Sequence, residues 1–428
     1  MSANTHLNVL LLGSGGRESA LARAIAGSPR LGKLFIAPGN GGTGAYGTNL
    51  PFAADDFSAI AGAVADNAID LVVVGPEDPL VKGLRQALEG TGVAILGPGA
   101  DGAALEGSKD FAKEFMSRHG IPTARHLTVD ADNAQAGIEF LASLKAPYVL
   151  KADGLAAGKG VLIEQDLDSA CAALRTMLGG QFGKASAKVV IEEFLSGIEC
   201  SVFVLTDGMG NWRVLPPAKD YKRAFDGDEG LNTGGMGAVS PPPFADASFL
   251  EKVESRIIAP TVRGLLAEGI DYRGFIFLGL MNCGGEPMVI EYNVRMGDPE
   301  TEVVMPRIKS DVLELFMAAA NGRLADAPEL ETYSDTALTV VAVAGGYPGS
   351  YRKGDAIGGL ANPADSIVFH AGTRADESGN ILTNGGRVLA VTSLAPTIAQ
   401  AAEKSYRTLE NISFDGMRYR SDIGSDLK

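Results

Sequence analysis

The chain has 428 residues, of which 46% are hydrophobic and 21% are charged, so it can form several well-packed domains. Its formal net charge of −15 argues against a nucleic-acid-binding protein, because phosphate backbones attract basic surfaces. No apolar run or basic leader predicts a membrane span or secretion. The three cysteines are far apart and odd in number, which fits a chain without a disulfide framework. The four histidines are scattered, so a histidine-rich zinc site or a Ser–His–Asp triad is poorly supported.

The first part of the chain, residues 1–106, alternates short apolar strands with helices, a pattern typical of a parallel, doubly wound sheet. Ligands of such sheets bind beyond the carboxyl ends of the strands, where three turns are expected to lie. The turns are Gly13-Ser14-Gly15-Gly16, Pro38-Gly39-Asn40 and Gly75-Pro76-Glu77-Asp78. Strands are predicted at 8–12, 33–37, 70–74 and 93–96, and a helix at 17–27.

The turn at residues 13–16 follows a strand and opens a helix, so its amides, together with Arg17, favour a phosphate. A dinucleotide site is weakly supported, because Glu18 stands where the last glycine of Gly-x-Gly-x-x-Gly belongs. A tight turn that needs glycine only for packing is the alternative.

The second part, residues 107–194, is expected to form a small α+β unit around a glycine-rich loop, Gly154–Gly160. The loop joins strand to strand and lacks the Ser or Thr of a Walker A loop, so it reads as a hairpin. With Lys151 before it and Lys159 within it, the hairpin can fold over triphosphate oxygens, whereas the alternative is a mobile surface hairpin. Strands are predicted at 148–151, 161–164 and 188–193, with helices ending near 119 and spanning 167–178.

The third part, residues 195–329, contains the most informative segment, a strand expected to run through Glu291, Asn293 and Arg295. Residues two apart in a strand share a face, so these three side chains should point one way and the alternating apolar ones the other. Two hard oxygen ligands beside a permanent cation predict a magnesium-type site that also meets an anion.

Other elements of the third part and of the strand-rich fourth part, residues 330–428, follow from composition and periodicity. Strands are predicted at 201–205, 275–281, 337–344, 367–370 and 387–392, long helices at 247–268 and 397–412, and a flexible run at 226–237.

The order of these motifs resembles the ATP-grasp ligases and, in finer detail, the phosphoribosylamine–glycine ligase family. The resemblance covers essentially the whole chain and implies a Rossmann-like N-terminal domain, a two-part ATP-grasp fold and a C-terminal domain. Its strings are Leu11-Leu12-Gly13-Ser14-Gly15-Gly16-Arg17-Glu18, Ala37–Asn40, Val74–Glu77, Leu105–Lys109, Lys151–Val161, Asn232–Ala238, Gly297-Asp298-Pro299-Glu300-Thr301, Gly345–Gly349 and His370–Thr373.

The family resemblance implies ATP-dependent coupling of glycine to 5-phosphoribosylamine through glycyl phosphate, a step of de novo purine biosynthesis. It implies small-molecule substrates and a bound Mg²⁺ or Mn²⁺. The net charge argues against a nucleic-acid partner, the lack of a long apolar run against a membrane partner, and the scattered cysteines fit a cytoplasmic location. The oligomeric state stays open, with a monomer as one option.

The resemblance also implies roles for individual residues. For ATP, these are Lys109, Lys151, Gly158, Lys159, Gly160, Glu192, Glu193, Phe194, Leu195 and Glu199. For the metal they are Glu291 and Asn293, and for the chemistry Arg295, Asp298 and Lys222. For glycine and phosphoribosylamine they are Gly13, Ser14, Gly15, Gly16, Arg17, Asn40, Glu77, Asp78, Asp220, Thr233, Gly234, Gly235 and Met236.

Surface or turn roles remain the alternatives for Glu199, Asp298, Asp220 and Lys222. The chain departs from the usual family pattern at four positions, Ser19, Lys219, Tyr221 and Glu302, where the family commonly has His, Gln, His and Gln. These departures concern substrate contacts rather than the reaction class.

Two other functions are open: a different ATP-grasp ligase or carboxylase, and a nucleotide-binding sensor without catalysis. The segment 232–237 and the turn at Gly13 separate a phosphoribosylamine–glycine ligase from other ATP-grasp ligases and carboxylases, since each serves a particular substrate. The presence of Lys151, Glu291, Asn293 and Arg295 argues against the second.

Overall fold

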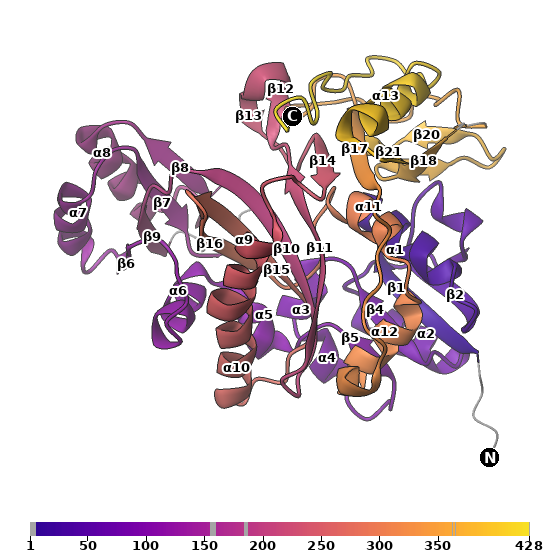
Figure 1. Cartoon of the computed structure of the whole chain (residues 1–428), viewed down its shortest axis with the longest axis horizontal. Coiled ribbons are helices and arrows are strands. Elements are labelled where there is room, and N and C mark those ends of the chain that lie inside the picture. The colour runs from indigo at the N-terminus through magenta and orange to yellow at the C-terminus, as the bar shows by residue number, and fades with distance from the viewer. Residues whose placement is uncertain (1–5, 155–159, 184–186, 362, 364, 428) are drawn as a thin grey trace.

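A computed structural model describes residues 6–154, 160–183, 187–361, 363 and 365–427 of the chain. Three main sheets organise these residues: a five-stranded, a four-stranded and an eight-stranded sheet. In Figure 1 the four-stranded sheet and its helices form a lobe that projects from the rest of the molecule. No helix in the described ranges has the length and apolarity that crossing a bilayer requires.

The five-stranded sheet near the N-terminus is parallel, with the order β3-β2-β1-β4-β5, which confirms the predicted doubly wound architecture. Its central strand is apolar on both faces because Leu10 and Leu12 belong to one core cluster, and Val9 and Leu11 to another. The elements are β1 (Leu7–Gly13), α1 (Gly16–Ala26), β2 (Leu31–Pro38), β3 (Thr48–Asn49), α2 (Phe57–Asp66), β4 (Leu71–Val74), α3 (Glu77–Val81), α4 (Leu84–Ala87), β5 (Ala94–Leu96) and α5 (Ala100–Gly107).

The four-stranded sheet is antiparallel, with the order β6-β9-β7-β8, and its core cluster includes buried residues of both α7 and α8. Strand β6 had no counterpart among the predicted strands, since its sequence lacks a clear apolar alternation. The elements are α6 (Lys109–Arg118), β6 (His126–Asp130), α7 (Ala134–Ser143), β7 (Tyr148–Ala152), β8 (Val161–Glu164), α8 (Leu167–Leu178) and β9 (Lys188–Glu193).

The eight-stranded sheet has the order β16-β15-β10-β11-β14-β17-β21-β18, so strands from both sides of the predicted boundary at residue 330 share one sheet. The division into four parts stays a prediction. The strands are β10 (Ile198–Asp207), β11 (Trp212–Asp220), β14 (Gly237–Ser240), β15 (Arg273–Cys283), β16 (Glu286–Asn293), β17 (Thr336–Val343), β18 (Ser366–His370) and β21 (Arg387–Ala395).

The long helix predicted at 247–268 is present, with one wide turn inside it. Helix α9 (Ala247–Val253) continues through a π-helical turn, Glu254–Ile258, into α10 (Ala259–Ala267). Pro260 follows that turn and has no N–H to donate, which favours a local widening of the helix. Further helices are α11 (Thr301–Val304), α12 (Val312–Ala320) and α13 (Ile398–Leu409).

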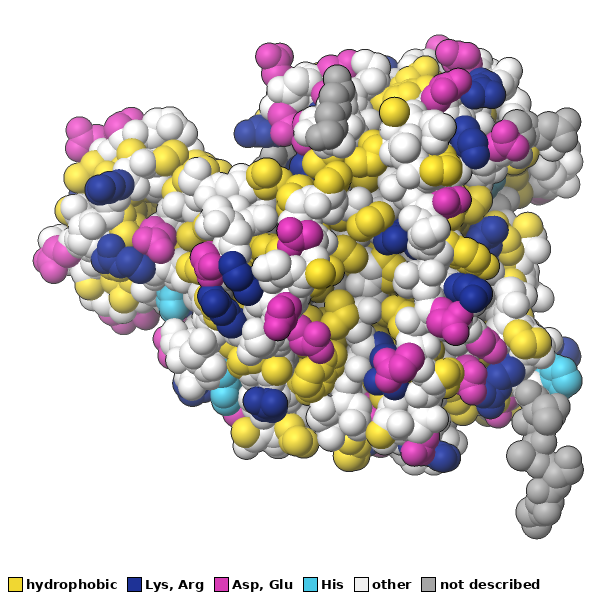
Figure 2. Space-filling model, in the orientation of Figure 1, with side chains coloured by type: hydrophobic (Ala, Val, Ile, Leu, Met, Phe, Trp, Pro, Cys, Tyr) yellow, Lys and Arg dark blue, Asp and Glu magenta, His cyan; other side chains and the backbone are white. Residues whose placement is uncertain are grey.

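The prediction of a flexible run at 226–237 is wrong. Strands β12 (Arg223–Phe225) and β13 (Glu229–Asn232) form a hairpin, which is followed by β14. The C-terminal segment holds this hairpin, with Gly227 N–H donating to Asp422 Oδ2 at 2.8 Å. A small hairpin of β19 (Thr373–Ala375) and β20 (Ile381–Thr383) faces the N-terminal sheet across a cavity. Acidic and basic side chains are interspersed over the face shown in Figure 2.

Candidate active site

The turn after β1 is built around the carboxylate of Glu18. The backbone of Gly13 has φ +124°, and the Glu18 side chain fills the space that a Cβ would occupy at Gly13 and at Gly75. Glycine is therefore required at the carboxyl ends of both β1 and β4, because the buried carboxylate packs between them.

Carboxylates occupy much of the expected phosphate cradle at the start of α1. Gly15 N–H donates to Glu18 Oε2 at 2.6 Å, and Arg17 N–H donates to Asp298 Oδ2 at 3.1 Å. The Arg17 guanidinium turns inward, to Glu18 Oε1 at 2.6 Å and the Met296 carbonyl at 3.2 Å. In this arrangement the Arg17 guanidinium binds other groups of the protein, whereas the sequence predicted a contact with a ligand phosphate.

Asn40 joins three loops and has little capacity left for a ligand. Its side-chain N–H groups donate to the carbonyls of Ser14 at 2.9 Å and His370 at 2.8 Å, and to Ser19 Oγ at 3.0 Å. Its side-chain oxygen accepts from Gly42 N–H at 2.9 Å. Asn40 therefore shapes the wall of the site by holding the turns together.

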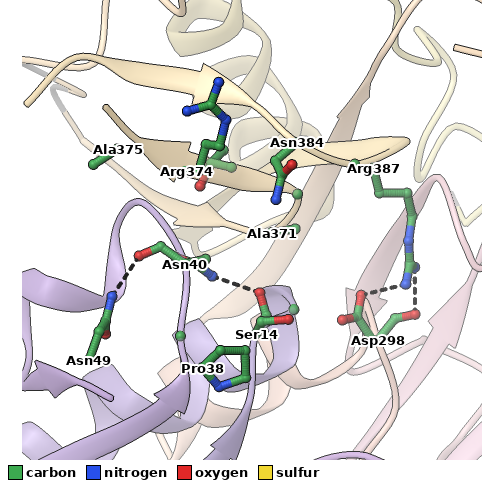
Figure 3. A pocket seen from close by; sticks show the side chains of 15 residues that line it. Ser14, Pro38, Asn40, Asn49, Asp298, Ala371, Arg374, Ala375, Asn384 and Arg387 are labelled. Atoms are coloured by element: carbon green, nitrogen blue, oxygen red, sulfur yellow. Dashed lines mark hydrogen bonds and ion pairs between the residues drawn. The ribbon is translucent and has the colours of Figure 1, made fainter. Parts of the chain in front are cut away.

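A cavity of about 660 Å³ lies between the N-terminal turns and the C-terminal strands. Ser14 and Asn40 line one side, and Arg374, Asn384 and Arg387 line the other (Figure 3). In this view the Arg374 guanidinium is turned away from Ser14 and Asn40. The C-terminal residues were not predicted, although the Gly385-Gly386 pair before Arg387 marked a close approach of backbone.

Arg387 fastens two loops of the site to each other. Its guanidinium donates to the carbonyls of Gly234 at 2.6 Å and Asp298 at 2.7 Å, and lies 2.9 Å from Asp298 Oδ1. Burial opposes the charge on Asp298, but Arg387 and Arg17 outweigh it and lower the pKa of that carboxyl. Asp298 is therefore an ionised link between α1 and the C-terminal strands.

Strand β16 contains Glu291 and Asn293, the two residues predicted as metal ligands, and it also contains a bulge. The register with β15 shifts between Gly279 and Leu280, which leaves Ile290 as the extra residue. In the part of the chain that the structure describes, the side chains of Glu291 and Asn293 have no hydrogen-bond or ion-pair partner. Their oxygen atoms are therefore available to a ligand.

Strand β16 ends at Asn293, so Arg295 lies two residues beyond the strand that was expected to run through it. The Arg295 guanidinium instead lies between two carboxylates, 3.2 Å from Glu77 Oε2 and 2.9 Å from Glu106 Oε1. Burial raises the pKa of Glu106, whereas Arg295 and Arg17 outweigh burial at Glu77 and lower its pKa. Arg295 thus connects the segment after β16 to Glu77 and Glu106 beside the N-terminal sheet.

Lys109 and Lys151, two of the lysines predicted to bind ATP, lie beside β16, and we refer to them as the lysine cluster. Lys109 Nζ donates to the Gly154 carbonyl at 3.3 Å, and Lys151 Nζ donates to the Ile290 carbonyl at 3.3 Å. Burial lowers the pKa of Lys109, although Glu291 stabilises its charge. Lys151 also lies 2.8 Å from Glu192 Oε1, in a nearly solvent-free position.

The other residues predicted for ATP have different surroundings. Glu193 accepts a hydrogen bond from Arg125 N–H at 3.0 Å, and Phe194 is exposed. Gly160 is described and buried, whereas the predicted Gly158 and Lys159 lie outside the described residues. Leu195 follows in the segment between β9 and β10, where it is partly exposed.

A second cluster of charge lies around Lys222. Its ammonium contacts the carboxylate of Glu199 and lies 3.4 Å from Asp220 Oδ1. Burial raises the pKa of Asp220, and burial together with Asp220 raises the pKa of Glu300 to about 7. Thr233 lies beside Lys222, since its N–H and hydroxyl both donate to the Lys222 carbonyl at 2.8 Å.

Two predicted substrate contacts lie elsewhere in the structure. Met236 is 2% exposed and packs in a hydrophobic cluster, while its N–H donates to the Tyr221 carbonyl at 2.7 Å. Asp78 is exposed and pairs with Lys82 at 3.2 Å on the surface. Neither side chain faces the cavity or the lysine cluster.

Family models for phosphoribosylglycinamide synthetase match the chain in three blocks: the N domain over residues 7–106, the ATP-grasp (A) domain over 107–301 and the C domain over 337–426. The chain belongs to this family. Among curated relatives, the phosphoribosylamine–glycine ligases of Escherichia coli O6:H1 and Caulobacter vibrioides are each 46% identical, over 426 and 420 residues, with 98% of both chains covered.

Solved structures agree with the family assignment and with the predicted ATP-grasp architecture. The crystal structure of phosphoribosylamine–glycine ligase from Thermotoga maritima matches with a TM-score of 0.85 and 36% identity, covering 97% of this chain and all of that one. Biotin carboxylase from Campylobacter jejuni matches with a TM-score of 0.74 at 14% identity, covering 98% and 94% of the two chains. The second match concerns the fold alone.

Proposed function

We propose that the protein ligates glycine to 5-phospho-D-ribosylamine, with ATP converted to ADP and phosphate, as a step of de novo purine biosynthesis. One observation carries the proposal: the three family blocks extend over the chain, and their candidate residues converge on two adjoining sites. Arg295 follows the strand that carries the candidate oxygen ligands, and Asp298, three residues further on, lines the cavity.

The chemistry requires activation, because a carboxylate is a poor acceptor for an amine. Transfer of the γ-phosphoryl group of ATP to the glycine carboxylate gives glycyl phosphate and ADP. The amine of phosphoribosylamine then attacks the acyl carbon, the C–O bond to phosphate breaks, and the amine loses a proton. Exclusion of water protects the acyl phosphate between the two steps.

Lys109 and Lys151 are placed to bind the phosphates of ATP, since both ammonium groups lie beside β16. Glu291 and Asn293 fit Mg²⁺ or Mn²⁺, because their hard oxygen atoms have no partner among the described residues. Within those ranges no cluster of three or more His, Cys, Asp or Glu side chains could hold a metal, so phosphate oxygens and water would complete the shell. When bound, the cation would screen the negative charge of the transferred phosphoryl group.

Glycine is proposed to bind near Lys222, Asp220 and the 233–235 loop. Lys222 lies between the Glu199 carboxylate and Asp220, and Arg387 fixes the loop through the Gly234 carbonyl. These groups can hold a small zwitterion at the end of the lysine cluster. Glu199 would at the same time be available to the ribose of ATP.

Phosphoribosylamine is proposed to occupy the cavity between the N-terminal turns and the C-terminal strands. Ser14, Gly15 and Asn384 supply polar lining, and Arg374 is a cation able to rotate toward a phosphate. Glu77, which begins α3 and pairs with Arg295, is proposed to supply the carboxylate that accepts the amine proton. Small-molecule partners and a cytoplasmic location are parts of the same proposal.

The proposal is tested by phosphate release from Mg·ATP with purified protein. We expect release only when glycine and phosphoribosylamine are both present, with one glycinamide ribonucleotide formed for each phosphate. Replacement of glycine by alanine or bicarbonate provides the control for other ATP-grasp chemistries. No phosphate release with the complete mixture, or release supported by bicarbonate alone, would contradict the proposal.

A further inference from the structure

Lys113 is a buried lysine that the proposed chemistry does not use. It lies on α6, the helix that precedes the first strand of the four-stranded sheet, and its side chain is buried, with the residue 2% exposed. Its ammonium donates to Thr123 Oγ1 at 2.7 Å and to Glu192 Oε2 at 2.8 Å. A buried charge is costly unless it is paired, so an ordinary core position would not favour lysine.

The partner of Lys113 is shared with Lys151. Glu192 is 3% exposed, and its other oxygen, Oε1, lies 2.8 Å from Lys151 Nζ. One carboxylate is therefore flanked by two ammonium groups, and the three side chains carry a net charge of +1 when all are ionised. Without Lys113 the remaining Lys151–Glu192 pair would be neutral.

Both lysines are also connected to the bulge of β16. Thr123 Oγ1, which accepts from Lys113, donates to the Val289 carbonyl at 2.7 Å. Lys151 Nζ donates to the Ile290 carbonyl at 3.3 Å. The two consecutive carbonyls directly precede Glu291, so the lysines and the oxygen ligands share one rigid support.

We propose that Lys113 is a positioning residue for ATP: it takes up part of the charge of Glu192, so that Lys151 keeps an un-neutralised ammonium for a phosphate. The inference rests on the ATP site proposed above, in which Lys151 binds phosphate. Among the described residues, Lys151 donates one N–H to the Ile290 carbonyl and lies 2.8 Å from Glu192 Oε1 without a hydrogen bond to that atom, so its ammonium keeps N–H capacity for a phosphate.

The charge state of Lys113 provides a specific readout. The groups that face it are Glu192, Lys151 and Glu193, with Lys109 further along its own helix. Burial, partly offset by Glu192, lowers the pKa of Lys113 to about 8. Lys113 is thus charged below that pH and neutral above it, so nucleotide affinity should fall as the pH rises through about 8.

The experiment is calorimetric titration of the full-length protein with Mg·ADP between pH 7 and pH 9. For Lys113→Met we expect the Kd at pH 7 to rise on the order of tenfold, with no further rise at higher pH. The wild-type Kd should rise across this range, and that of Lys113→Arg should stay level because arginine remains charged. Lys309→Met, which removes an exposed lysine paired with Glu331, is the matched control and should behave as wild type.

Wild-type affinity and an unchanged pH profile in Lys113→Met would overturn the inference. If that variant does not fold, Lys113→Arg decides, since a wild-type rise in its Kd with pH would equally overturn it. The titration needs neither glycine nor phosphoribosylamine. A negative phosphate-release assay and a negative result at Lys113 are therefore separate outcomes.

Discussion

Buried charges are arranged around the candidate site so that most of them have partners. Glu18 is bound by Gly15 N–H and Arg17, Asp298 by Arg387, and Glu192 by Lys113. In the described ranges the Oε2 atom of Glu302 and the Oε1 atom of Glu192 are buried without a hydrogen-bond partner, but Glu192 Oε1 lies 2.8 Å from the Lys151 ammonium, whereas Glu302 has no ion pair. It packs against Gly16, where the carboxyl group leaves no room for a Cβ.

Replacement of Glu302 by glutamine should stabilise the protein at neutral pH. Burial, reinforced by Asp298, raises the pKa of Glu302 well above its usual value of 4.5. Its contribution to stability is therefore fully present below pH 4.5 and is lost as the pH rises toward the folded-state pKa. Glu302→Gln removes that loss, and we expect the free energy of unfolding at pH 8 to increase by roughly 1–3 kcal/mol.

Urea unfolding at several pH values between 5 and 8 measures the Glu302 effect. The difference between Glu302→Gln and wild type should shrink as the pH falls. Glu89→Gln, at an exposed position on the same chain, should change nothing at any pH. A variant that is less stable at pH 8 would indicate that Glu302 is ionised and bound.

At the scale of elements, one bulge and one arginine decide how the strands present their side chains. The bulge at Ile290 puts Val289 and Tyr292 in the core and directs the Ile290 carbonyl to Lys151. Arg387, at the start of β21, then joins the 233–235 loop to Asp298. Both features depend on neighbours that are distant in the sequence.

Arg387→Met should weaken the binding of glycine and phosphoribosylamine while leaving nucleotide binding intact. The change removes the donors to the Gly234 and Asp298 carbonyls, so the loop loses its fixed position. We expect the KM for both substrates to rise about tenfold or more, since misplacement by a small distance has large kinetic effects. Steady-state kinetics with each substrate varied gives these values.

Two controls accompany the Arg387 experiment: a binding measurement and a second variant. The Kd for Mg·ADP should match wild type, because among the described residues Arg387 makes no hydrogen bond or ion pair with Lys109 or Lys151. Arg352→Met, which removes an exposed arginine paired with Asp355 and Asp415, should keep wild-type KM values. A rise in the Kd for Mg·ADP, or unchanged KM values, would refute the assigned role.

At the scale of the whole molecule, the end of the chain orders a segment from its middle. Arg420 is 2% exposed and donates to Asp228 Oδ1 at 2.8 Å and to the Arg223 carbonyl at 3.2 Å. Ser421 N–H donates to Asp226 Oδ1 at 2.8 Å. These contacts hold the β12–β13 hairpin, which leads into the proposed glycine loop.

Arg420→Met should therefore release the β12–β13 hairpin. The change removes the cation that pairs with Asp228 and Asp422, whose carboxylates are partly solvated, and we expect a loss of roughly 1–2 kcal/mol in the free energy of unfolding. Amide hydrogen exchange measured by mass spectrometry should accelerate over residues 223–232 and stay unchanged in β1 and β4. Arg407→Met, at an exposed helix position, is the control, and equal protection in both variants would show that the hairpin is stable alone.

Short-range patterns in the sequence were sufficient for the main elements and for part of the site. Alternating strands and helices predicted the parallel N-terminal sheet, and Glu291 and Asn293 were recognised because residues two apart share a strand face. Lys109 and Lys151 followed from the family resemblance. The strands, the helices and the shared strand face depend on propensity and periodicity, which act over a few residues.

Only the tertiary structure decided which charges meet. Arg17 binds Glu18 and the Met296 carbonyl, Arg295 binds Glu77 and Glu106, and Lys113 shares Glu192 with Lys151. Several of these partners are more than a hundred residues apart, and the choice among equivalent carboxylates depends on burial and on strand register. The sequence by itself therefore determined the family, the parallel N-terminal sheet and the candidate oxygen ligands. Packing of distant segments determined the surroundings of each ionised group, because electrostatic pairing is a property of three-dimensional distance.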